Sequence, residues 1–170
     1  MHPYGLSPLD FSELDNFFKE FDFSEDEAHT REYLGMVQES AYCQQIIIHE
    51  ASSISDEDLF GFVALSITHE DVDNVPGLLV EFIYVKPKYR KKIAEFADTQ
   101  YSYIILDYII EVALKLQKQV AINHVYLVPV NEKVRALYLD YGFVNIPSSG
   151  KNENEDFMVF NLLDEDPVLM

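Results

Sequence analysis

The sequence predicts an α/β fold, with one mixed central sheet, helices on both of its faces, and a single domain over residues 1–170. Three observations predict it. The N-terminal third carries apolar residues at spacings of three and four, which is typical of helices. Short runs rich in β-branched and aromatic residues follow, and two further helical segments interrupt them. The order of helices, three strands, helix, strand, helix and two strands favours a sheet covered by helices.

The first half of the chain is expected to form two helices and then a hairpin. A helix is predicted over residues 9–21. Ser24 and Glu27 have the spacing of a capping box, which predicts a second helix running to about Cys43. The runs QQIIIHEA and LFGFVALSITHE predict two strands, and the polar stretch SSISDED between them favours a hairpin.

The second half begins with GLLVEFIYV, residues 77–85, the most apolar strand candidate. It is expected to end at Lys86–Pro87, because proline lacks a donor for the strand ladder. A long buried helix is predicted from about Thr99 to Gln119, with Asp98 or Thr99 as its N-cap. The remaining predictions are a strand at 124–130, a helix at 131–142 that ends at Gly142, and strands at 143–146 and 156–163.

The net charge of −18 is the strongest compositional signal. Residues 1–80 hold seventeen acidic residues against Lys19 and Arg31, whereas five of the twelve basic residues lie within 86–92. An acidic surface repels nucleic-acid phosphates and anionic lipid and attracts cations. The charge therefore predicts no nucleic-acid partner, no membrane partner and a cationic substrate. The alternative, that the acidic residues only keep the protein soluble, stays open.

The cysteine content and the N-terminal sequence exclude further classes of protein. Cys43 is the one cysteine, which excludes an internal disulfide framework and a cysteine zinc site. The histidines show no metal-ligand spacing, so no metal is expected. The first twenty residues contain no apolar signal-peptide core, and Asp107 and Glu111 interrupt the longest apolar stretch. These features predict a cytoplasmic protein.

Two motifs give the chain a likeness to a known family. The stretch NEKVRALYLDYGF has asparagine, a small apolar residue, an apolar–tyrosine pair and glycine–phenylalanine at set spacings, carried here by Asn131, Val134, Leu137, Tyr138, Gly142 and Phe143. The end of the 77–85 strand has the pattern V-x-P-x-Y-R, carried by Val85, Pro87, Tyr89 and Arg90. With this order of elements, residues 10–163 resemble the GNAT superfamily of N-acetyltransferases. The resemblance implies a sheet split after its fourth strand and acetyl-CoA as cofactor.

The loop after Val85 departs from the family pattern. In the family a glycine-rich loop holds the CoA diphosphate with its backbone amides, at the N-terminus of a helix. Here no glycine lies between Gly77 and Gly142, and about seven extra residues lie around 91–97. Lysine and arginine side chains are expected to supply charge in place of amide geometry. The alternative is a closed loop on a fold that has lost its cofactor.

The resemblance also implies a set of site residues. Tyr138 takes the position of the general acid that protonates the departing thiolate, and Glu81 that of the base that draws the amine proton through a water. The backbone N–H groups near Ile83 and Val85 are implied to contact the oxyanion and the pantetheine. The remaining implied cofactor contacts are Arg90, Lys91, Lys92, Gln100, Tyr101, Ser102 and Asn131. For Tyr138 a packed core tyrosine, and for Glu81 a solvent-facing or ion-paired residue, remain alternatives.

The predicted function is transfer of an acetyl group from acetyl-CoA to a primary amine of a cationic small molecule or peptide. The rival is a non-catalytic interaction module of the same fold that binds a basic protein through its acidic face. A homodimer also stays open. The short run at Ala64–Ser66 and the helical N-terminus resemble tRNA-acetylating toxins of the family. The acidity of the chain predicts that their tRNA activity does not extend to this protein.

Overall fold

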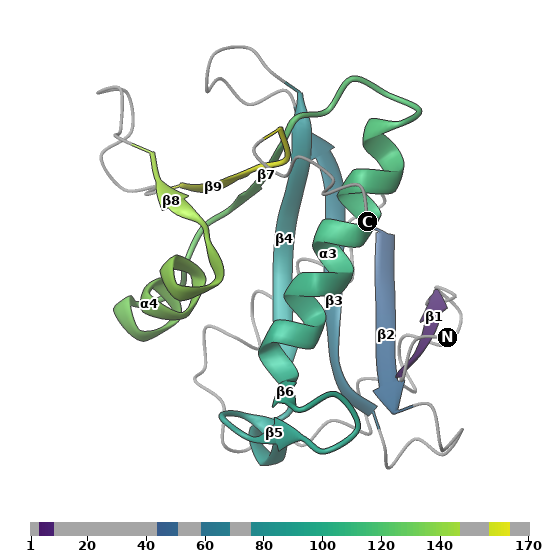
Figure 1. The fold of residues 1–170 in the computed structure, drawn as a ribbon, viewed down its shortest axis with the longest axis vertical. Helices are drawn as coiled ribbons and strands as arrows, with labels where there is room; N and C mark the ends of the chain where they lie inside the picture. The colour runs from purple at the N-terminus through teal and green to yellow at the C-terminus, as the bar shows by residue number, and fades with distance from the viewer. Residues whose placement is uncertain (1–3, 9–43, 51–58, 69–75, 147–156, 164–170) are drawn as a thin grey trace. The chain divides into compact units, whose positions relative to one another are not determined.

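The structure, a computed structural model, describes residues 4–8, 44–50, 59–68, 76–146 and 157–163 (Figure 1). The described strands form a seven-stranded mixed sheet in the order β1-β2-β3-β4-β7-β9-β8, and a separate two-stranded ladder of β5 and β6. The strands are β1 (Tyr4–Pro8), β2 (Gln44–Glu50), β3 (Leu59–Thr68), β4 (Gly77–Val85), β5 (Ile93–Ala94), β6 (Thr99–Gln100), β7 (His124–Leu127), β8 (Val144–Asn145) and β9 (Met158–Asn161). The helices are η2 (Pro87–Tyr89), α3 (Tyr101–Gln117) and α4 (Glu132–Tyr141). The predicted mixed α/β sheet is confirmed. The helices predicted at 9–21 and 24–43, with Cys43, lie outside the described residues.

The chain divides into two compact units, and each is built from two chain segments. Unit 1 comprises residues 1–66 and 81–107, and unit 2 comprises 67–80 and 108–170. The elements β3, β4 and α3 each supply residues to both units.

Antiparallel pairing organises the strands of unit 1. β2 pairs with β3, which confirms the predicted hairpin, and its register shifts between Ile48 and His49. β1 pairs with β2 from Tyr4↔Glu50 to Pro8↔Ile46 and was not predicted. Its sequence, YGLSP, contains glycine and proline, which strands usually avoid. β1 stands first in the sheet order, and an edge strand tolerates a proline because its outer side needs no ladder donor.

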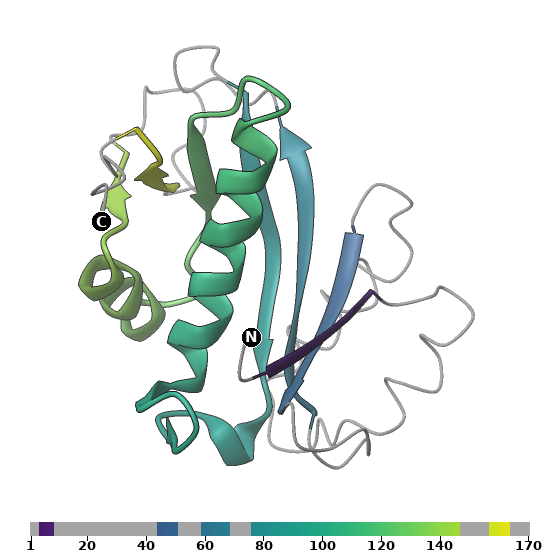
Figure 2. The ribbon, with the colours of Figure 1, turned by 45° about the vertical axis from the view of Figure 1, so that its right-hand side comes forward.

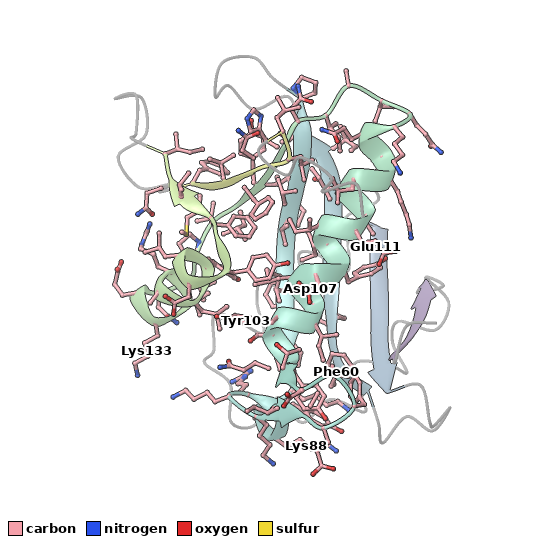
Figure 3. The ribbon with its side chains drawn as sticks, viewed as in Figure 1. Phe60, Lys88, Tyr103, Asp107, Glu111 and Lys133 are labelled. Carbon is pink, nitrogen blue, oxygen red and sulfur yellow. The ribbon has the colours of Figure 1, made fainter. Side chains whose placement is uncertain are left out.

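The long helix α3 confirms the predicted apolar helix but starts later than expected. Thr99 belongs to β6, and Asp98 has a left-handed backbone with φ of +50°, so neither residue caps the helix. The N-cap prediction is therefore wrong. The first half of the helix is largely buried. A polar row runs along it at spacings of four residues, in which Tyr103 and Glu111 are half-buried and Asp107 and Lys115 are exposed. Figure 3 shows Tyr103, Asp107 and Glu111 on the helix. Glu111 and Lys115 form an ion pair of 2.7 Å along this row.

In unit 2, the first four residues of β4 pair in parallel with β7, from Gly77↔His124 to Val80↔Leu127. Parallel neighbours need a long crossover, and α3 lies in the connection between these two strands (Figure 2). β9 pairs antiparallel with both β7 and β8. The strands predicted at 124–130, 143–146 and 156–163 are confirmed as shorter elements. No helix in the described part of the chain is long and apolar enough to cross a lipid bilayer.

Candidate active site

The second half of β4 carries three of the predicted site residues, Glu81, Ile83 and Val85. The pairing of β4 with β7 ends at Val80↔Leu127, so β4 continues for five residues without a ladder partner in β7. Burial alternates along this segment: Glu81, Ile83 and Val85 are half-buried, and the residues between them are buried. An extended stretch whose edge is released from its neighbour leaves backbone groups available to an extended ligand.

A hydrogen bond that the sequence did not reveal holds the Glu81 side chain. Ser66 Oγ on β3 donates to Glu81 Oε1 at 2.6 Å, in a partly buried position. This length is in the range of a hydroxyl bonded to a carboxylate, which is stronger than a bond between neutral groups. Ser66 closes the ALS run, but sequence spacing alone could not show which strand residue it would meet.

Arg90 is fixed at the end of β4. Its Nε donates to the carbonyl oxygen of Val85 at 2.8 Å, and its guanidinium carbon lies 5.5 Å from the centre of the Tyr84 ring. The Val85 carbonyl is therefore already an acceptor within the protein, whereas the predicted oxyanion and pantetheine contacts were backbone N–H groups. Lys88 Nζ lies 4.8 Å from the centre of the Tyr89 ring. Aromatic contacts of this kind restrict long cationic side chains and keep the charge at the surface.

The loop expected to hold the diphosphate forms a closed hairpin. β5 and β6 pair through Ile93↔Gln100 and Ala94↔Thr99, and the Tyr101 amide at the start of α3 donates to the Lys92 carbonyl at 3.3 Å. Further backbone bonds within the loop are donated by the amides of Tyr89, Arg90, Lys92, Ala97 and Asp98. Many of the amides that a glycine-rich loop would turn toward a phosphate are therefore used inside the loop.

Aromatic packing holds the hairpin against the start of α3. The Tyr101 ring lies 4.6 Å from that of Tyr89, 4.9 Å from Phe60 and 6.1 Å from Phe96, measured between ring centres. Tyr101 is only 7% exposed. Figure 3 shows Phe60 and Lys88 at the end of α3 where the hairpin lies. The Tyr101 side chain and amide are thus both engaged within the protein, and Gln100 pairs within the hairpin.

The groups of this loop that suit a phosphate are its exposed cationic side chains. Arg90, Lys91 and Lys92 are exposed, and Lys91 adopts a left-handed backbone with φ of +60°. Ser102 is half-buried in the first turn of α3. The residues present fit the phosphates of CoA through side-chain charge and not through the amide geometry of a glycine-rich loop.

The other two predicted residues, Asn131 and Tyr138, belong to unit 2. Asn131 is the N-cap of α4, and its Oδ1 accepts from the amides of Lys133 and Val134 at 3.0 Å each. Gly142 ends the helix with φ of +121°, a conformation that other residues rarely adopt, which confirms the predicted C-cap. The asparagine and glycine of the family motif therefore have a structural role in fixing this helix.

Tyr138 lies on the buried side of α4. It is 8% exposed, and its ring packs against Phe143 at 5.8 Å between centres. Burial raises the pKa of the Tyr138 phenol well above its usual range, because desolvation disfavours the phenolate. The phenol thus stays protonated at physiological pH and can serve as a proton donor but not as a base.

Solved structures match the chain almost from end to end. A structure described as a KacTA–DNA complex matches with a TM-score of 0.68 and 18% identity, over 95% of this chain and 94% of the other. AtaTR bound with AcCoA matches with a TM-score of 0.69 and 14% identity, over 96% of each chain. AtaT complexed with acetyl-methionyl-tRNAfMet matches with a TM-score of 0.64 and 12% identity, over 95% and 96%. The chain therefore has the GNAT fold of these proteins, as predicted. No family model and no curated relative matches the sequence.

These neighbours overturn one prediction from the charge. The exclusion of nucleic acid is wrong for this fold, since similar chains are solved with DNA and with an acetylated aminoacyl-tRNA. The cationic character of the acceptor and the basic protein partner were inferred from the same acidity and lose their basis with it. The neighbours also give no support to a small-molecule or peptidic acceptor. The physical reason lies in where the charges are. Residues 1–80 hold seventeen acidic residues against two basic ones, whereas residues 86–92 hold five of the twelve basic residues. Net charge is thus a poor guide to any one surface, because charges act over only about 8 Å at physiological salt.

Proposed function

We propose that this protein transfers the acetyl group of acetyl-CoA to the α-amino group of an aminoacyl-tRNA. The observation that carries the proposal is the likeness over at least 94% of both chains to AtaT and KacT structures, among them one bound with AcCoA and one complexed with acetyl-methionyl-tRNAfMet. The exposed cations at 88–92 support it, because phosphate groups of a cofactor or of RNA are recognised by such side chains.

The protein's own residues are assigned to the steps of acetyl transfer. Glu81 takes a proton from the acceptor amine, directly or through a water. The amine nitrogen then bonds to the acetyl carbon as the carbon–sulfur bond breaks, and the Tyr138 phenol gives its proton to the departing thiolate. Acetyl-CoA, when bound, supplies the activated thioester.

An acetylation assay tests the proposal. Purified protein and acetyl-CoA are offered aminoacyl-tRNA, the free amino acid and a polyamine, and thiol release is followed together with mass analysis of the acceptor. The expected result is N-acetylation of aminoacyl-tRNA alone. Tyr138→Phe should lower kcat by about 10²–10⁴-fold. Tyr141→Phe, on the same helix and half-exposed, is the matched control. Full activity of Tyr138→Phe would remove Tyr138 from the mechanism.

Cofactor binding is tested separately by calorimetry. Replacing Lys91 and Lys92 by alanine should weaken CoA binding, whereas Lys118→Ala, an exposed lysine just beyond the end of α3, should not. A larger loss for CoA than for dephospho-CoA would place these lysines at the 3′-phosphate. Equal affinities for all three proteins would remove the lysines from the cofactor site.

The closed hairpin favours a second candidate, a non-catalytic interaction module of the same fold. AtaT is also solved with the C-terminus of the antitoxin AtaR, so a protein partner suits this candidate. The absence of any heat of binding at millimolar CoA, together with no acetylation of any acceptor, would favour it over the enzyme.

A further inference from the structure

One hydrogen bond within unit 1 has no part in the function described so far. Glu81 is the one carboxylate residue of β4, and Ser66 on the neighbouring strand β3 donates to one of its two oxygens. Both residues are half-buried. In the part of the chain that the structure describes, no other hydrogen bond or ion pair to this carboxylate is found.

This single contact has a geometric consequence. An ionised carboxylate offers about four lone-pair sites on two oxygens, and Ser66 occupies one of them on Oε1. A glutamate side chain turns about three bonds, so without a partner it would adopt several rotamers. The Ser66 bond restricts these rotamers, and Oε2 has no hydrogen bond or ion pair with any described residue.

We propose that Ser66 is a positioning residue, which holds the Glu81 carboxylate so that Oε2 accepts the proton of the acceptor amine. The inference rests on the proposed acetyl transfer and deepens it. Ser66 does not touch the reacting atoms. It keeps the base in one orientation, and proton transfer is efficient only when the base lies within hydrogen-bond reach of the proton.

A purely structural reading makes a different prediction. If the bond only joined β3 to β4, its loss would weaken folding and leave the rate of the folded enzyme unchanged. If Ser66 positions the base, its loss should lower kcat and leave the affinity for acetyl-CoA nearly unchanged. The two readings are therefore separated by kinetics on folded protein, with unfolding measured alongside.

The test is a double-mutant cycle with Ser66→Ala, Glu81→Gln and the combined variant. Ser66→Ala should lower kcat by about 10- to 100-fold, the range of a hydrogen bond to a charged group, with KM for acetyl-CoA within about twofold. Ser66→Ala introduced into the Glu81→Gln variant should lower kcat no further, because Ser66 affects the rate only through the Glu81 carboxylate, which that variant lacks. Ser66→Thr keeps the hydroxyl and should restore most of kcat. Ile67→Ala, the exposed neighbour on β3, controls for disturbance of the strand.

Each outcome decides the matter. Losses in kcat that add in the combined variant, or a Ser66→Ala protein as fast as the wild type, would overturn the positioning role. The urea unfolding midpoints of the wild type, the two single variants and the combined variant report the Ser66–Glu81 hydrogen bond independently of any reaction. If the effects of the two substitutions on the urea midpoint are not additive, and the wild-type protein acetylates no acceptor, the Ser66–Glu81 bond is structural. That result would also refute the proposed function. Coupled midpoints with additive kcat losses would refute the positioning role alone.

Discussion

At the scale of single residues, the loop between β4 and α3 holds two non-glycine residues in a left-handed backbone. Lys91 has φ of +60° and Asp98 has φ of +50°. For residues other than glycine this conformation costs roughly 1–2 kcal/mol. The family pattern places glycines in this loop, whereas this chain places charged side chains. The backbone strain is therefore balanced by the hairpin bonds and the aromatic packing around Tyr101.

Lys91→Gly is the first prediction. Glycine adopts the left-handed region freely, so relief of strain should offset its larger chain entropy, and the free energy of unfolding should stay within about 0.5 kcal/mol of wild type or rise. Lys115→Gly, inside α3, is the matched control and should lower the free energy of unfolding by about 1 kcal/mol. Urea denaturation measures both. A loss at Lys91 as large as at Lys115 would show that the left-handed backbone is absent in solution.

The raised pKa of Tyr138 predicts how stability depends on alkaline pH. An unfolded tyrosine ionises near pH 10, whereas the buried phenol keeps its proton to higher pH. The unfolded state therefore releases a proton first, and stability, fully present below about pH 10, falls above it by up to about 1.4 kcal/mol per pH unit. Tyr138→Phe should lose less stability than wild type between pH 10 and 11. Parallel curves for the two proteins in urea denaturation would contradict a buried phenol.

At the scale of elements, α4 shows how one residue can be given two roles. The resemblance implied that Asn131 contacts the cofactor, whereas the structure shows its side chain capping the helix. Asn131→Ala should lower the free energy of unfolding by about 0.5–2 kcal/mol through the lost cap. Asn131→Ser keeps an N-cap acceptor and should retain stability. The CoA affinity of the serine variant, measured by calorimetry, then reports the cofactor role alone, and an unchanged affinity would leave Asn131 with the cap only.

At the scale of the whole molecule, the salt concentration sets how many of the protein's charges act on an approaching RNA. Seventeen of the thirty acidic residues lie within residues 1–80, and five of the twelve basic residues lie within 86–92. At 0.01 M salt charges act over about 30 Å, so the net charge of −18 opposes an approaching RNA; at 0.15 M they act over about 8 Å. At that shorter range only charges close to a phosphate act on it, and Arg90, Lys91 and Lys92 are exposed.

RNA affinity should therefore pass through a maximum as salt rises from about 10 to 500 mM, in contrast to the steady fall usual for basic proteins. Fluorescence anisotropy with a labelled tRNA measures it. Replacing Lys91 and Lys92 by alanine should lower the maximum, and Lys118→Ala should not. A steady decline from the lowest salt would show that the acidic segments do not influence binding.

The sequence by itself determined the strands of the seven-stranded sheet from Gln44 onward, the long helix and the capped helix α4, because periodicity, proline and capping residues act within a few positions of each other. It also determined the family likeness through the motif around Tyr138. It did not predict the short strands β5 and β6. Only the tertiary structure decided that Tyr101 packs among aromatic rings, that the loop amides bond to one another, and that Ser66 meets Glu81. These contacts join residues from different elements, and whole-chain charge misled for a related reason: interactions depend on distance in space, which neither composition nor local spacing records.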